Sequence, residues 1–112
     1  TLGAFVPPND FDFAWCCEFV EHVEEKYVDN FMKTFQKCKL VAMTHGVPGQ
    51  PGYHHVNCQE SKYWIDIFAK YGFDYLQEES MLLRKTLFNP DGSWTSNGSH
   101  VRNTLMIFKR KV

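Results

Sequence analysis

The longest patterned stretch of the chain covers residues 11–35 and changes its period part-way along. Residues 11–15, FDFAW, form a short aromatic and apolar run that predicts a buried strand. Apolar residues then recur at every fourth position, namely Phe19, Val23, Tyr27, Phe31 and Phe35. Acidic and basic residues, Glu21 among them, fall mostly between these positions, as on the solvated face of a surface helix. The pattern therefore predicts one long amphipathic helix directly after the strand.

The rest of the chain repeats this alternation. Residues 39–43, 73–76 and 101–109 predict further strands, and residues 81–88, although ambiguous, are interpreted as a short helix. Between them, Asn57 and Glu60 have the spacing of a capping box, and Gly72 is a natural helix end. The alternation predicts an α/β layer of parallel strands, with the last strand inserted antiparallel. No glycine-rich turn between a strand and a helix occurs in the chain, so a nucleotide-cradling loop cannot come from it.

Composition and charge narrow the function classes. The chain has 112 residues and a formal charge of −1, which fits one domain. The near-neutral balance, without a basic block, predicts no nucleic-acid partner, and no apolar run is long enough to predict a membrane span. The four cysteines, at positions 16, 17, 38 and 58, form no C-x-x-C pair. This spacing argues against a disulfide framework or a structural zinc site and favours reduced thiols in a cytoplasmic protein.

Polar and reactive side chains follow the first two predicted strands, at the edge where open α/β sheets bind ligands. The candidates are Cys16, Cys17, Glu18, His22, His45, His54, His55 and Asn57. The cysteines could equally be small core residues, and His22 could be a packed histidine that lies one helical turn beyond Glu18. Five histidines and several thiols also permit a metal site, but their spacing matches no known ligand motif. We therefore predict no metal.

Two segments resemble a known family. The run FDFAWCCEFVEHV resembles the fourth strand and following helix of class I S-adenosylmethionine-dependent methyltransferases. THGVPGQPGYHHVNCQ, followed by YWIDIFAKYGF, resembles the fifth strand, its loop and the next helix in a methyltransferase-like-domain subset. The resemblance implies that residues 1–112 form one partial domain, the C-terminal half of a Rossmann-like sheet with strand order 4-5-7-6 and an antiparallel last strand. The half that carries the cofactor loop would be absent.

The resemblance also implies a function, namely methyl transfer from S-adenosylmethionine to a small-molecule or sugar-like acceptor. It places Cys16 and Glu18 near the cofactor, His22 and His45 in catalysis, and the loop containing His54, His55 and Asn57 against the substrate. The alternative is a non-catalytic half-domain that needs a partner to supply the cofactor-binding half. In either case we expect the chain alone to be inactive, and to self-associate through the unpaired edge of its first strand.

Overall fold

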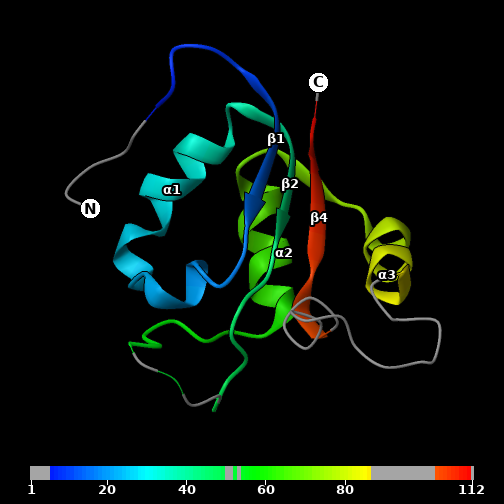
Figure 1. The fold of residues 1–112 in the computed structure, drawn as a ribbon. Helices are drawn as coiled ribbons and strands as arrows, with labels where there is room; N and C mark the ends of the chain where they lie inside the picture. The colour runs from blue at the N-terminus through cyan, green and yellow to red at the C-terminus, as the bar shows by residue number, and fades with distance from the viewer. Residues whose placement is uncertain (1–5, 50–51, 53, 87–102, 112) are drawn as a thin grey trace.

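The computed structural model describes residues 6–49, 52, 54–86 and 103–111. Four strands form one mixed sheet in the order β1-β2-β4-β3 (Figure 1). The strands are β1 (Phe11–Cys16), β2 (Cys38–Met43), β3 (Phe73–Tyr75) and β4 (Met106–Arg110). The α-helices are α1 (Val28–Phe35), α2 (Ser61–Lys70) and α3 (Gln77–Thr86). Over the described residues, no helix is both long and apolar enough to cross a membrane.

Strand pairing confirms the predicted α/β layer. β1 and β2 are parallel, with Phe11 opposite Cys38 and Cys16 opposite Met43. β4 lies between β2 and β3 and runs antiparallel to both of them. The strand predicted over residues 101–109 begins only at Met106, and residues 101–102 lie outside the described part of the chain.

One face of the sheet carries the main core. The apolar sides of α1 and α2 cover it, and the Phe68 ring of α2 stacks on Phe108 of β4 with 3.8 Å between ring centroids. The helix α3 lies on the other side of the sheet in Figure 1. There Ser80 Oγ accepts a hydrogen bond of 2.8 Å from the backbone N–H of Ile107 in β4. The short helix predicted over residues 81–88 is thus this longer helix, whose described part ends at Thr86.

The prediction that the first strand is buried is wrong. β1 is an edge strand, and Phe11, Phe13 and Trp15 are 52%, 52% and 53% exposed. Successive side chains of a strand point to opposite faces, so the alternate residues Ala14 and Cys16 pack against the core instead. The three aromatic side chains, called the aromatic stripe below, occupy the face that α1 and α2 leave open.

The prediction of one long helix is also wrong. Two 3₁₀ turns, η1 (Val20–His22) and η2 (Glu25–Tyr27), precede α1, which starts only at Val28. The backbone carbonyl of Glu21 accepts hydrogen bonds from the N–H groups of Val56 and Asn57, both at 3.0 Å, rather than from a helical neighbour. A tertiary contact with a distant loop therefore replaces the helical bond that the period-four pattern predicts.

The end of α2 is as predicted, but its start is not. Gly72 has a φ of +90°, the left-handed conformation that ends many helices at glycine. The helix begins at Ser61, and its N-cap residue Glu60 makes no side-chain capping bond. Asn57 is not a cap, because it is buried, at 3% exposed, and its N–H bonds to Glu21.

Candidate functional site at the carboxyl ends of β1 and β2

The parallel pairing of β1 and β2 brings the segments that follow them to one edge of the sheet. Both arrowheads point to the same side in Figure 1, where the loop between β2 and α2 also passes. The N–H of Thr44 donates to the Cys16 carbonyl at 3.1 Å, and the N–H of Glu18 donates to Thr44 Oγ1 at 2.9 Å. These two bonds join the ends of the strands, so the segments that follow β1 and β2 are held at fixed positions relative to each other.

The residues predicted to contact the cofactor, Cys16 and Glu18, lie at the end of β1 and just after it. Cys16 is 9% exposed, and its burial, reinforced by the nearby charge of Glu21, raises the pKa of its thiol to about 12. The thiol is therefore protonated at neutral pH and behaves as a small apolar group. Glu18 is exposed and has a left-handed φ of 54°, so it does not share a helical face with His22 as predicted. Cofactor contact by Cys16 and Glu18 stays a prediction.

Residues 54–57 are docked on η1. Besides the two bonds to the Glu21 carbonyl, the His22 ring nitrogen Nδ1 lies 3.1 Å from the carbonyl oxygen of His54. Because a carbonyl oxygen only accepts, Nδ1 of His22 is the donor in this hydrogen bond. The ring of His55 meets the ring of His22 edge-on, with 4.7 Å between centroids. The structure thus brings His22 together with the loop that was predicted to contact the substrate.

A buried carboxyl group completes this cluster. Glu21 is only 2% exposed, and its Oε1 atom has no hydrogen-bond partner among the described residues. The Nδ1 atom of His55 is likewise buried and without a partner in that part of the chain. Glu21, His22 and His55 each offer one donor atom, and these atoms all lie within 4.8 Å of one another. We call these three residues the Glu-His-His cluster.

Sequence reasoning missed Glu21, because the period-four pattern assigned it to a solvated helix face. The η1 turn instead places its side chain inward. The available signal was the pair Glu21-His22 followed by a second pair, His54-His55, after the next strand. Neither pair belongs to a helical metal motif, so the sequence alone does not indicate that the two pairs meet. They meet because β1 and β2 are parallel and end at the same edge of the sheet.

Two glycines let the surrounding backbone approach the cluster closely. A Cβ atom on Gly52 would lie 2.5–2.7 Å from the ring atoms of His55. A Cβ atom on Gly46 would lie 2.8 Å from Cys58 Sγ and 3.1 Å from the Cβ of Glu21. Side chains at these two positions would displace His55 or Glu21, so the glycines help to fix the geometry of the cluster.

The second predicted catalytic histidine, His45, lies at the same edge but is differently engaged. It is 4% exposed, its Nδ1 lies 2.9 Å from the Gly46 carbonyl oxygen, and its Nε2 lies 3.0 Å from Ser61 Oγ. Nδ1 therefore carries the proton and Nε2 accepts from the Ser61 hydroxyl. Burial lowers the pKa of the imidazole, which favours this neutral form. Both ring nitrogens are bonded within the protein, and a catalytic role for His45 stays a prediction.

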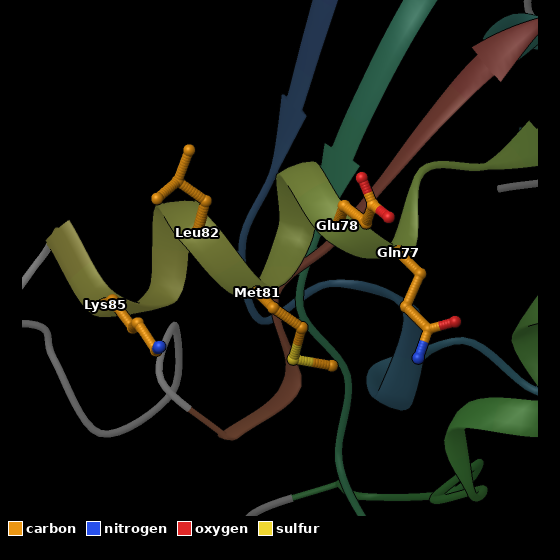
Figure 2. A pocket seen from close by; sticks show the side chains of 5 residues that line it. All are labelled: Gln77, Glu78, Met81, Leu82 and Lys85. Atoms are coloured by element: carbon orange, nitrogen blue, oxygen red, sulfur yellow. The ribbon is translucent and has the colours of Figure 1, made fainter.

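No protein-family model, curated protein or solved structure matches this chain. A separate surface hollow lies along α3, lined by Gln77, Glu78, Met81, Leu82 and Lys85 (Figure 2). None of the predicted site residues lines this hollow, and it joins no cluster of histidine, cysteine or acidic side chains that the described residues form. The edge of the sheet at the carboxyl ends of β1 and β2 is therefore the better candidate for a catalytic or binding site.

Proposed function

We propose that this chain is the acceptor-binding part of an S-adenosylmethionine-dependent methyltransferase, which transfers a methyl group to a hydroxyl of a small-molecule or sugar-like acceptor. The observation that carries the proposal is the convergence of Glu21, His22 and residues 54–57 at the carboxyl ends of two parallel strands. In open α/β sheets this edge is where ligands bind.

The topology of the sheet supports the same proposal. The order β1-β2-β4-β3, with the last strand antiparallel between its neighbours, corresponds to the order 4-5-7-6 that the resemblance implies. In that correspondence, β1 and β2 are the fourth and fifth strands of the complete domain. The edge of β1 that is open in the described residues would then face the part that binds the cofactor.

Methyl transfer needs the acceptor oxygen, the methyl carbon and the sulfonium sulfur in line, so the protein acts mainly by holding two reactants and excluding water. A hydroxyl acceptor must also lose its proton, for which the enzyme supplies a proton-accepting group. The Glu-His-His cluster suits this task better than His45 does, because the Nε2 atom of His22 is not the nitrogen that bonds to His54. His45 instead has both ring nitrogens bonded.

The test is a calorimetric titration with S-adenosylmethionine and a single-turnover assay, on a protein that contains this chain together with the cofactor-binding half. We expect His22→Ala to lower turnover by roughly 10²–10⁴-fold with cofactor affinity little changed. The matched surface control is Leu82→Lys on α3, where the side chain is 64% exposed, and it should keep wild-type turnover. Failure of that protein to bind S-adenosylmethionine would refute the proposal.

The aromatic stripe favours the second candidate function, a non-catalytic half-domain that needs a partner supplying the cofactor-binding half. Three half-exposed aromatic side chains on an edge strand expose both apolar surface and unpaired backbone groups. An active methyl transfer in the test above would reject this candidate. A stable complex with a separate partner chain, without turnover, would support it.

Under either candidate we predict that the isolated chain self-associates through the aromatic stripe. Trp15→Lys should lower the apparent mass in light scattering, because it places a charge on the exposed face of the edge strand. Leu82→Lys, the same kind of change on α3, should leave the association unaltered. A chain that is monomeric at all tested concentrations and melts cooperatively would contradict the prediction.

A further inference from the structure

We propose that Glu21, His22 and His55 bind one divalent transition-metal ion, against our expectation from the sequence that the chain holds no metal. The binding itself does not depend on the proposed function. Only the use of the ion, which is to hold the acceptor hydroxyl, rests on that function.

The geometry of the donor atoms allows them to share one ion. The three donor atoms lie within 4.8 Å of one another. Ligands at about 2.0–2.2 Å from a shared tetrahedral ion lie roughly 3.3 Å apart. Rotation of the side chains can close this difference, since His22 and His55 are only partly buried. Two imidazoles and one carboxylate are also a donor set that borderline ions such as Zn²⁺ or Fe²⁺ accept.

The state of the side chains in the cluster also favours a bound ion. A buried carboxyl oxygen without a partner is costly, and Glu21 Oε1 is such an atom among the described residues. A bound cation would compensate that cost. In His22, Nδ1 is the nitrogen that bonds the His54 carbonyl, so the other ring nitrogen, Nε2, is the one that can offer a lone pair to an ion. Metal-binding histidines usually have such a carbonyl or carboxylate partner for the other ring nitrogen.

The backbone around the cluster holds its residues together. The Glu21 carbonyl holds the N–H groups of Val56 and Asn57, so the two ligand-bearing segments are tied together. Gly52 lies directly against the His55 ring, where a Cβ atom would not fit. The donor atoms are therefore held near one another by the backbone around them and are not merely surface side chains that happen to be close.

Three protein ligands leave at least one coordination position open, as in catalytic zinc sites. An oxygen ligand of the acceptor fits that position, and a bound ion lowers the pKa of a hydroxyl that it contacts. With Nε2 of His22 bound to the ion, this nitrogen would no longer accept the hydroxyl proton. The proton would pass to water instead, and the oxygen would form its bond to the methyl carbon. The carbon–sulfur bond would break with its electron pair going to sulfur, which turns the sulfonium into a neutral thioether. The acceptor class is thus an alcohol or phenol rather than a carbon nucleophile.

The experiment is a calorimetric titration of the full chain with ZnCl₂, with MgCl₂ as the comparison ion. We expect one Zn²⁺ per chain and much weaker binding of Mg²⁺, which prefers oxygen ligands. Glu21→Gln and His55→Ala should each weaken Zn²⁺ binding by about 100-fold or more, since even changes in the groups that orient ligands cost about 10–100-fold. Gly52→Ala should weaken it as well, by displacing the His55 ring.

Two controls keep the outcome clear. His54→Asn retains the carbonyl that bonds His22 and suits the positive φ of 56° at this position, so Zn²⁺ affinity should stay within about threefold. Cys58→Ser tests for binding through a thiolate and should also leave the affinity unchanged. Binding that survives Glu21→Gln and His55→Ala, or that is lost in Cys58→Ser, would overturn the proposal.

The readout separates this inference from the proposed function. Zn²⁺ binding that depends on the cluster, together with failure to bind S-adenosylmethionine in the longer protein, would reject the methyltransferase and keep the metal site. Methyl transfer that is unaffected by a chelator would keep the methyltransferase and reject the ion as the group that holds the acceptor. A variant that does not unfold cooperatively would be replaced by His22→Asn, which removes one donor from the partly buried side of the cluster.

Discussion

Two histidine environments lie at the same edge of the sheet and differ in what their rings are free to bind. His45 is buried, and its ring bridges Gly46 and Ser61 through both nitrogens. His22 uses one ring nitrogen on the His54 carbonyl, and its neighbour His55 has a buried nitrogen without a partner among the described residues. The first environment joins segments of the fold, and the second gathers donor atoms around one point.

The comparison shows that position after a strand does not decide the role of a histidine. His22 and His45 both come shortly after parallel strands that end at one edge. Their difference comes from residues far along the chain, since Ser61 bonds the His45 ring and Thr104 bonds its backbone N–H. The same substitution should therefore have different consequences at the two places.

The largest expected difference is in stability. His45→Ala should lower the free energy of unfolding by about 2–4 kcal/mol, because it opens a cavity and leaves the Ser61 hydroxyl without its partner. The Gly46 carbonyl would keep only the bond from the N–H of Gln59. His22→Ala should cost less than about 1 kcal/mol, since its ring is only partly buried. Urea unfolding of the two variants measures both values. Equal losses would show that the two environments do not differ as described.

The next effect is on the pH dependence of stability. Burial lowers the pKa of His45 from its ordinary value of 6.5, and the Arg84 charge lowers it further, whereas the Gly46 bond and the Glu21 charge oppose this shift. Below pH 6.5 the unfolded chain then binds more protons than the folded chain. The contribution of His45 to stability is therefore full above pH 6.5 and falls below it, by at most about 1.4 kcal/mol per pH unit. Urea unfolding between pH 5 and 8 should show a shallower fall in His45→Gln.

The smallest effect concerns the hydroxyl that bonds the His45 ring. Ser61→Ala removes the 3.0 Å bond to Nε2 and should lower the free energy of unfolding by about 1 kcal/mol. The matched change is Ser80→Ala on α3, whose hydroxyl bonds the Leu76 carbonyl and the Ile107 N–H instead. Zn²⁺ affinity should not change in either variant. A loss of Zn²⁺ affinity in Ser61→Ala would couple the two histidine environments.

The strands were the part of the fold that local pattern could predict. The two parallel strands and the antiparallel last strand follow from short apolar runs separated by helical periodicity. The late start of α1 at Val28 could not be predicted, because it depends on the bonds from Val56 and Asn57, which are distant in the sequence, to the Glu21 carbonyl. The exposure of Phe13 could not be predicted either, since an apolar strand residue gives no information on whether a neighbour covers its face.

The sequence predicted the location of the candidate site better than the roles of the individual residues in it. His22 and residues 54–57 do meet, because the ends of parallel strands share an edge. The burial of Glu21 was not predicted, because the period-four pattern assumed an α-helix. Residues 20–22 form a 3₁₀ turn instead, which rotates the side chain relative to the α-helical pattern. His45 shows the opposite case, in which a residue of the predicted type at the predicted edge is engaged by the protein itself.

The place of β4 in the sheet has a consequence for how the chain acquires its structure during synthesis. β4 is the last described strand in the sequence, yet it lies in the interior of the sheet and alone joins β2 to β3. Until residues 106–110 leave the ribosome, the pair β1-β2 and the strand β3 have no backbone bonds between them. Nascent chains would therefore spend that interval with exposed strand edges, the state in which chaperones bind and neighbouring chains pair wrongly.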